Sequence, residues 1–208
     1  MEQFNPLPVW SLFLFAYIFG SIPWGLVLTR FFSTEDIRKH GSGNIGATNV
    51  RRIAGSTLGV MTLIGDMAKG AFPVYLAIVL TGDHDIRGEL YVSLVALSAF
   101  MGHLYPCFLR FKGGKGVATA AGCFLVISPV GCLIAFLLFS TVLGLSNRAS
   151  AGSLSAAAGL PMAVWWTGHS LLITGCAIVM AIFIFFRHQG NIRRLISGTE
   201  PVFRAKER

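Results

Sequence analysis

Residues 40–52 bring together the glycines, hydroxyls and cations that a phosphate-binding segment needs. The segment reads His-Gly-Ser-Gly-Asn-Ile-Gly-Ala-Thr-Asn-Val-Arg-Arg and lies between two long apolar runs. Glycine permits positive φ and a close approach of peptide N–H groups to a ligand. The relevant residues are Gly41, Ser42, Gly43, Asn44, Gly46, Thr48, Asn49, Arg51 and Arg52. We call this the first polar segment and predict that it binds an anion.

The first polar segment has two alternative interpretations. The spacing Gly41-x-Gly43-x-x-Gly46 matches a dinucleotide-binding fingerprint, which requires a preceding strand, a βαβ unit and an acidic residue about 20 positions later. The preceding run, residues 9–32, is too long for a strand, and Asp66 lies inside the next apolar run. A flexible connection is the other alternative, although a short turn needs fewer such residues.

A second polar segment, residues 110–119, reads Arg-Phe-Lys-Gly-Gly-Lys-Gly-Val-Ala-Thr. It leads into a short predicted helix, whose N-terminal N–H groups and dipole favour phosphate. Lys115 would add a point charge. The candidate binding residues are Lys112, Gly113, Gly114, Lys115 and Gly116. The segment does not match a Walker A loop, and a basic patch at the membrane surface is the alternative interpretation.

A third polar segment, residues 187–194, reads Arg-His-Gln-Gly-Asn-Ile-Arg-Arg. On a helical continuation of the last apolar run, His188 and Asn191 are three positions apart and share a face. A solvated tail is the alternative. The short connection that contains Arg148 is expected on the same side of the membrane, so that Ser150 could contribute.

The composition identifies a membrane protein made of helices. Hydrophobic residues make up 54% of the 208 residues and charged residues 12%, and the mean hydropathy is +0.68. Such values lie far from those of a soluble domain. The net charge of +8 therefore reports topology rather than nucleic-acid binding. We expect one membrane-embedded domain over residues 1–208, with an all-α fold.

Apolar runs that could cross a membrane of ~30 Å are separated by the polar segments. Before the last span, which ends at Arg187, they cover residues 9–32, 57–80, 90–109, 117–127, 130–145 and 154–166. Residues 117–145 could form one bent span or two short ones. Two spans place every basic loop on one side, in agreement with the positive-inside rule. We therefore predict seven helices, with the N-terminus outside and the C-terminus in the cytoplasm.

Several other polar residues have simpler explanations. Asp66 and Lys69 are three positions apart inside a span and could satisfy each other, although ionisable residues at that depth are functional candidates. His103 in an apolar helix is expected to be a packing residue. The four cysteines are expected to be small core residues, with no disulfide and no metal site.

Taken together, the three polar segments resemble a known family. Ser-Gly-Asn-Ile-Gly-Ala-Thr-Asn-Val-Arg-Arg (42–52), Gly-His (102–103) with Phe-Lys-Gly-Gly-Lys-Gly-Val-Ala-Thr (111–119), and Arg-His-Gln-Gly-Asn-Ile-Arg-Arg-Leu (187–195) are similar to the acyl-phosphate-dependent glycerol-3-phosphate acyltransferases, the PlsY family. The resemblance covers nearly the whole chain in length, span order and motif order.

The resemblance implies a seven-helix enzyme of the bacterial inner membrane. It would transfer a fatty acyl group from acyl phosphate to the 1-hydroxyl of glycerol 3-phosphate, releasing lysophosphatidic acid and phosphate. The residues that it places in the site are Ser42, Thr48, Arg52, Lys115, Ser150, His188 and Asn191. Glu200 is the best match to a glutamate that the family usually carries past the asparagine.

These expectations leave three classes of function to separate. An enzyme of this family would act on acyl phosphate and glycerol 3-phosphate among membrane lipids, as a monomer, without a metal or other cofactor and without nucleic acid. A transporter of a small phosphorylated solute would place its site near the bilayer midplane between repeats, and no repeat is visible. A lipid-binding scaffold would need the basic residues but not the glycines.

Overall fold

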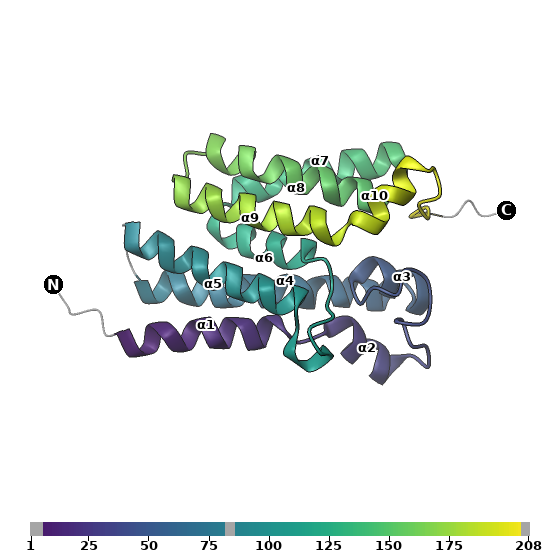
Figure 1. The fold of residues 1–208 in the computed structure, drawn as a ribbon, viewed down its shortest axis with the longest axis horizontal. Coiled ribbons are helices and arrows are strands. Elements are labelled where there is room, and N and C mark those ends of the chain that lie inside the picture. The colour runs from purple at the N-terminus through teal and green to yellow at the C-terminus, as the bar shows by residue number, and fades with distance from the viewer. Residues whose placement is uncertain (1–5, 82–85, 205–208) are drawn as a thin grey trace. The chain divides into compact units, whose positions relative to one another are not determined.

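A computed structural model of the protein describes residues 6–81 and 86–204, and all regular structure in these ranges is helical (Figure 1). The predicted all-α class is confirmed. The elements in chain order are α1 (Pro6–Gly20), α2 (Trp24–Phe32), α3 (Ala47–Ala54), α4 (Ser56–Thr81), α5 (Ile86–Leu104), the 3₁₀ helix η1 (Cys107–Leu109), α6 (Val117–Ile127), α7 (Pro129–Ser146), α8 (Ala149–Trp166), α9 (Leu171–Arg187) and α10 (Gln189–Ile196).

The stretch 117–145 forms two helices, as predicted. α6 ends at Ile127, Ser128 has an extended φ of −142°, and Pro129 begins α7 at the position where a missing N–H costs nothing. The first predicted span is also divided, because the chain leaves the helix at residues 21–23 and bends by 42° between α1 and α2. α9 and α10 meet at 62°.

Length and apolar composition support membrane spanning for three helices in the described residues, or five if each bent pair counts as one span. The three are α4, α7 and α5 extended through η1, and α6 is a shorter apolar helix. The predicted count of seven spans stays a prediction. The charges of Glu2, Asp83, Asp85, Lys206 and Arg208 contribute to the predicted topology, and these residues lie outside the described ranges. His84, which is expected in the outer loop, lies outside them as well.

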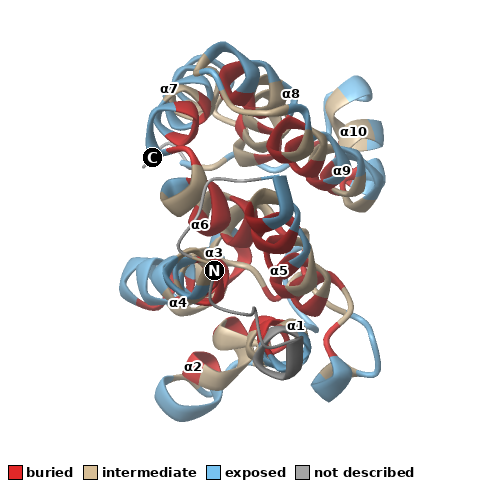
Figure 2. Cartoon of the chain, turned by 90° about the vertical axis from the view of Figure 1, so that its left-hand side faces the viewer, coloured by how far each residue is buried: buried red, intermediate tan, exposed pale blue. Residues whose placement is uncertain are grey.

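The chain divides into two compact units, the first ending at Ile127 and the second beginning at Ser128. The assignment of one domain to residues 1–208 therefore also stays a prediction. In the first unit α1, α4 and α5 pack side by side, and α6 packs on α4 (Figure 1). Figure 2 shows that α5 carries much of the buried surface of this unit.

Glycines set how closely the helices of the first unit approach. A Cβ on Gly122 of α6 would lie 2.0 Å from the carbonyl oxygen of Met67 in α4, and one on Gly70 would lie 2.2 Å from the carbonyl oxygen of Thr119. The α1–α5 crossing is similar, since a Cβ on Gly102 would lie 2.2 Å from the carbonyl oxygen of Tyr17. Small residues allow such contact where the surrounding lipid provides no hydrophobic drive.

A separate apolar cluster supports the first polar segment. Its buried members are Leu28, Ile37, Ile45, Val50 and Leu58, contributed by α2, the following loop, α3 and α4. A Cβ on Gly25 would lie 2.0 Å from the carbonyl oxygen of Ile45, so that the loop rests directly on α2. The polar residues of the segment are thus carried on an apolar base.

In the second unit α8 packs against both α7 and α9, and α10 contacts α8 and α9. The hydroxyls of Ser128 and Thr167, 3.2 Å apart, join the start of α7 to the end of α8. Outward faces of α7 and α9 carry large exposed apolar side chains: Val130, Leu133, Phe136, Leu137, Ile182 and Phe186. A bilayer is the solvent in which such faces are stable.

Candidate active site

The first polar segment is a tight loop followed by a helix. Gly41 and Gly43 have φ of 62° and 67°, as predicted for glycines in turns. Gly46 differs, because it precedes α3 with a φ of −80° that any residue could adopt. The sequence analysis did not predict α3. Val50 of this helix is fully buried in the supporting apolar cluster, which accounts for a helix in so polar a stretch.

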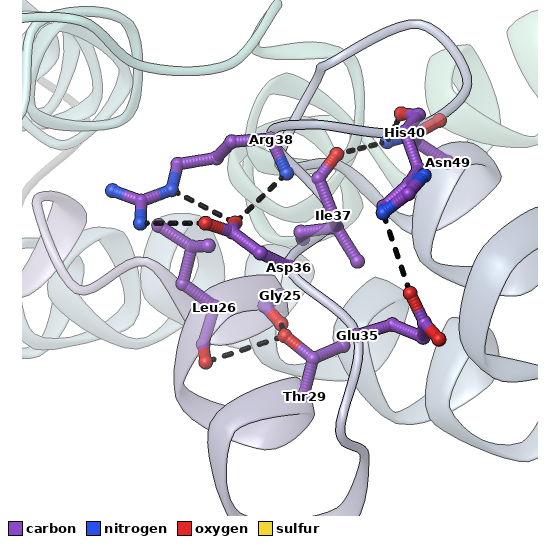
Figure 3. Close-up of polar contacts among 9 residues, drawn as sticks. All are labelled: Gly25, Leu26, Thr29, Glu35, Asp36, Ile37, Arg38, His40 and Asn49. Carbon is purple, nitrogen blue, oxygen red and sulfur yellow. Dashed lines mark hydrogen bonds and ion pairs between the residues drawn. The ribbon is translucent and has the colours of Figure 1, made fainter.

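Asn49 organises the loop from within (Figure 3). It is 2% exposed, and its Nδ2 donates to the carbonyl oxygens of Ile37 at 2.9 Å and His40 at 3.3 Å. Its Oδ1 accepts from the backbone N–H of Ser42 at 3.0 Å. Both ends of the amide are therefore used to hold the loop.

Other backbone amides of the loop are also used internally. The N–H of Gly43 donates to the carbonyl of His40 at 3.1 Å, and that of Gly46 donates to Oδ1 of Asn44 at 2.9 Å. The sequence analysis expected such N–H groups to converge on an anion. The structure instead places them on acceptors of the chain, because a buried or turning backbone must satisfy its own donors first.

Three polar side chains of this segment remain available. Ser42, Thr48 and Arg52 are exposed, and within the described part of the chain none of their side chains makes a hydrogen bond or an ion pair. Thr48 and Arg52 are four positions apart on α3 and so share one face. Two hydroxyls and a guanidinium are suited to the oxygens of a phosphate.

Neighbouring charges of the same loop are paired with each other. The guanidinium of Arg38 binds Asp36 through Nε to Oδ1 and Nη2 to Oδ2, each at 3.0 Å (Figure 3). These bonds lower the pKa of Asp36 to about 2. His40 lies 3.4 Å from the carboxylate of Glu35. Arg38 is therefore less available to an outside anion than Arg52.

The second polar segment is held by the end of α5. The N–H of Gly113 donates to the carbonyl of Leu104 and that of Gly114 to the carbonyl of His103, both at 3.1 Å. A Cβ on Gly113 would lie 2.2 Å from the carbonyl oxygen of His103. These glycines are required by space, and their amides are bonded within the chain. The predicted role of the N-terminal N–H groups of α6 in binding phosphate stays a prediction.

The rest of this segment leads into α6. Gly116 has a φ of 84°, and its carbonyl accepts the first helical hydrogen bond, from Ala120 at 2.8 Å. Lys115 is half-buried and Lys112 is exposed. Arg110 and Phe111 have left-handed φ of 50° and 62°, a strained conformation for residues with side chains.

In the second unit Glu200 gathers three of the polar groups near the chain end. Its Oε1 accepts from Oγ of Ser150 at 2.7 Å and from Nδ2 of Asn191 at 2.6 Å. Its Oε2 accepts from Nε of Arg194 at 2.7 Å. The structure thus brings together Ser150, Asn191 and Glu200, three residues that the resemblance associates with the site, and adds Arg194.

The environment of Glu200 favours its charged form. Burial by itself would raise the pKa of this carboxyl, which is only 6% exposed. The hydrogen bonds from Ser150, Asn191 and Arg194, with the charge of Arg194, outweigh burial and hold the pKa below its ordinary value. Glu200 is therefore an ionised carboxylate that accepts hydrogen bonds from three side chains.

His188 lies at the bend between α9 and α10 instead of on a continuous helix. It is 2% exposed, with φ −100° and ψ 7°. Its Nδ1 is 2.8 Å from the carbonyl oxygen of Ile184. Because a carbonyl only accepts, Nδ1 carries the hydrogen, and Nε2 of the neutral ring is an acceptor.

Two polar anchors were missed by the sequence analysis. Arg194 binds Glu200, and its position among several basic residues of the tail gave no signal to single it out. Asn147 ends α7 with a left-handed φ of 51°, and its side chain exchanges two hydrogen bonds of 2.9 Å with the backbone of Arg204. An asparagine just after a helical apolar run is a typical helix end.

The remaining polar residues are placed as follows. Three cysteines are buried as predicted, whereas Cys107 in η1 is exposed because that turn leaves the apolar run. Among the described residues no three His, Cys, Asp or Glu side chains gather as metal ligands would. A cavity of about 480 Å³ beside Asn147 and Arg204 is lined by none of the predicted site residues.

Comparison with known sequences finds one family. The model of the family described as glycerol-3-phosphate acyltransferase matches residues 10–198. The glycerol-3-phosphate acyltransferase of Syntrophotalea carbinolica is 49% identical over 92% of this chain and 96% of the relative. That of Geobacter sulfurreducens is 48% identical over 91% of this chain and 95% of the relative.

Two solved structures share the fold. One is the crystal structure of PlsY, an integral membrane glycerol 3-phosphate acyltransferase, in its glycerol 3-phosphate form, with a TM-score of 0.89, 35% identity and coverage of 95% of this chain and 96% of that chain. The other is the lysophosphatidic acid form, with a TM-score of 0.86, 34% identity and coverage of 94% and 95%.

The three polar segments, the all-helical fold and the extent of these matches agree. The resemblance inferred from residues 42–52, 102–119 and 187–195 is confirmed, and so are the enzyme class and the location in a membrane. The chain belongs to the family of integral membrane glycerol-3-phosphate acyltransferases.

Proposed function

We propose that this enzyme takes its acyl group from acyl phosphate and transfers it to the 1-hydroxyl of glycerol 3-phosphate. The hydroxyl oxygen attacks the acyl carbon, the bond from that carbon to the phosphate oxygen breaks, and inorganic phosphate leaves with the electron pair. Acyl phosphate is already an activated mixed anhydride, so positioning and charge stabilisation suffice. The relative solved in glycerol 3-phosphate and lysophosphatidic acid forms supports this acceptor and this product.

The observation that carries the proposal is that some polar side chains of the first polar segment bond within the loop while others are exposed to solvent. Asn49 and Asn44 satisfy the loop from inside, which leaves Ser42, Thr48 and Arg52 exposed without partners in the described chain. A loop whose internal donors are satisfied has its backbone ordered before the ligand binds, so only the outward side chains must still be ordered. We assign phosphate binding to these three side chains.

The other predicted site residues receive shaping or charge roles. Besides Arg52 of the first polar segment, Lys115 and Lys112 of the second polar segment supply two more cations. The glycines, Gly43, Gly46, Gly113, Gly114 and Gly116, shape the two segments rather than donate from their amides. In the second unit, Glu200 orients Ser150 and Asn191 toward their roles in the reaction.

Two acceptors suit the proton that leaves the attacking hydroxyl. One is a phosphate oxygen of the donor itself, and the other is Nε2 of His188, which is unprotonated when the ring is neutral. The variant His188→Gln separates them. If the imidazole takes the proton, the variant loses the limb of the pH–rate profile that reports histidine ionisation. An unchanged profile assigns the proton to the donor phosphate.

A small donor fits the chain better than a large one. Coenzyme A would need a surface for adenine and a 3′-phosphate, and a carrier protein would need a docking patch of about 800 Å². The cationic groups of this chain are instead concentrated in short polar segments. The positioned His-x4-Asp pair used by other glycerolipid acyltransferases is absent from the sequence.

The test is to supply acyl phosphate, acyl-CoA and acyl carrier protein in turn to the purified enzyme. Chain length is matched, glycerol 3-phosphate is present and no metal is added, and kcat/KM for formation of lysophosphatidic acid is compared. We expect acyl phosphate to be used directly and the other donors poorly. Equal use of acyl-CoA, or loss of activity in a chelator, would contradict the proposal.

We further infer a monomeric enzyme forming a single membrane-embedded domain in the bacterial inner membrane. The basic residues of the three polar segments support a cytoplasmic location for all of them. The enzyme would then bind the phosphate groups of both substrates on the cytoplasmic side, while the acyl chain stays among the membrane lipids.

A further inference from the structure

Three buried ionisable side chains meet inside the first unit. Asp66 and Lys69 of α4 are 3% and 1% exposed, and His103 of α5 is 4% exposed. Charges within a membrane protein are costly unless they pair, and a carboxylate–ammonium pair adds little net stability over apolar residues of the same size. A contribution to folding stability therefore does not explain why these three ionisable side chains are buried together.

The pair is connected to the break between α1 and α2. Lys69 Nζ lies 3.0 Å from Oδ1 of Asp66 and donates to the carbonyl oxygen of Ile22 at 2.8 Å. Ile22 belongs to the non-helical residues between these two helices. The position of the ammonium, and with it the carboxylate, is thus fixed from two elements.

On its other side the pair faces His103, which underlies the second polar segment. Nδ1 of His103 is 3.7 Å from Oδ1 of Asp66. A Cβ on Gly114 would lie 2.1 Å from Nε2 of His103 and 2.9 Å from its Cε1, so the ring packs directly beneath Gly114. The carbonyl of His103 also accepts the N–H of Gly114.

Gly113 and Gly114 have no side chains with which to anchor themselves. Both are held by the carbonyls at the end of α5, and Gly114 also packs on the ring of His103. We propose that Asp66, Lys69 and His103 are positioning residues, which hold the imidazole as the support of the second polar segment and so place Lys115 for the reaction. This inference rests on the charge role proposed for Lys115.

A steric exchange tests the support directly. Gly114→Ala should lower kcat/KM by about 10- to 100-fold, the cost of a displacement near 1 Å. The ring of His103 supplies the three nearest atoms to the added methyl, so adding His103→Ala should restore at least part of the lost activity. Gly113→Ala is the matched control, since its methyl would meet the carbonyl oxygen of His103, which His103→Ala retains.

A double-mutant cycle tests the charged pair. Asp66→Leu with Lys69→Met removes both charges together, so that neither is left buried without its partner. We expect kcat/KM to fall by about tenfold or more in the otherwise native enzyme and by less than about twofold in a Lys115→Met background. Thr62→Val, which removes a buried hydroxyl bonded only within α4, should leave turnover unchanged.

The outcomes separate this inference from the proposed function. If Lys115→Met lowers kcat/KM strongly but leaves it measurable, and the pair replacement lowers it about tenfold again, the positioning role alone is overturned. Failure of His103→Ala to improve Gly114→Ala would do the same. Full activity of Lys115→Met would overturn both the charge role of Lys115 and the inference that depends on it.

Discussion

Asn49 and Arg52 lie three positions apart on α3 and differ in burial and in hydrogen bonding. Asn49 is buried, and both its amide nitrogen and its oxygen are bonded inside the loop. Arg52 is exposed and has no polar partner in the described residues. A polar side chain that is hydrogen-bonded within the protein helps to shape a site, whereas an exposed one without such bonds can bind a ligand. Substitutions at the two should therefore fail differently.

Arg52→Gln is expected to lower kcat/KM by on the order of 10²-fold or more, the effect of losing one preorganised charge-stabilising group. The yield of folded protein in detergent should hardly change, because the guanidinium supports nothing in the described chain. Arg204→Gln serves as the control and should be nearly silent, since Arg204 is held through its backbone. Wild-type turnover of Arg52→Gln would show that the first segment was misassigned.

Glu200 should make stability depend on pH in a defined direction. Its pKa in the folded enzyme is below the ordinary value of 4.5, so its stabilising contribution is complete above that pH and is lost as the pH falls through the folded-state pKa. Glu200→Gln presents an amide to Nε of Arg194 and should cost about 1–3 kcal/mol. Thermal unfolding in detergent, compared with wild type, should show this difference at neutral pH and a smaller one in acid.

At the scale of helices, the first unit depends on contacts between backbones. α4 and α6 touch through Gly70 and Gly122, and α1 and α5 touch through Gly20 and Gly102. No side chain separates the helices at these points, so a methyl group must push them apart. The second polar segment joins α5 to α6, and its geometry follows from how closely they are held.

Gly122→Ala is accordingly expected to destabilise the protein by about 1–3 kcal/mol, as overpacking does. The methyl would lie 2.0 Å from the Met67 carbonyl, which belongs to a backbone and cannot swing away. Gly175→Ala in α9 meets nothing within 4 Å and should be neutral or slightly stabilising, because alanine favours helices. The measurement is thermal unfolding of both variants in the same detergent. Equal changes in unfolding temperature for Gly122→Ala and Gly175→Ala would contradict the role of the close helix contact.

The helices that could be predicted are those with their own apolar run. The bounds of α6 followed from Val117 and from Ser128-Pro129, and the structure has them unchanged. α3 could not be found in this way, since that polar stretch packs through Val50, Ile53 and Ala54 on residues distant in the sequence. The bend at His188 likewise depends on packing of α10 against α8, which no local pattern records.

The candidate site was predictable in its residue types but not in their use. Hydroxyls, amides and cations predicted phosphate binding, which stays a prediction, and the motifs identified the family. Which donors face outward depends on three-dimensional neighbours: Asn49 turns inward to the carbonyl of Ile37, twelve positions away. For Gly114, the decisive neighbour is the ring of His103, which belongs to a different element.

At the scale of the whole molecule, exposed apolar faces and basic connections together describe a protein set in a membrane. Helices such as α7 combine high hydropathy with little burial. The cations instead collect in the three polar segments and in the tail. An asymmetric distribution of Lys and Arg is the signal that orients spans during insertion.

The predicted orientation places residues 40–52, 110–116 and 187–208 in the cytoplasm and residues 81–89 outside. Single cysteines introduced into each of these regions of a cysteine-free variant should react with a membrane-impermeant reagent from opposite sides. The acidic connection should label in intact spheroplasts and the three polar segments only after permeabilisation. Labelling of residues 81–89 and 110–116 from the same side is incompatible with seven spans.

Phe203 and Arg204 are bonded to the turn between α7 and α8. The N–H of Phe203 donates to the carbonyl of Asn147 at 2.8 Å, next to the two bonds between Asn147 and Arg204. Glu200 lies just before this fastening. For the gene, this means that the reading frame must be kept through codon 204. A premature stop after codon 204 would spare every one of these bonds, whereas one at codon 200 would remove the carboxylate and act as a null allele.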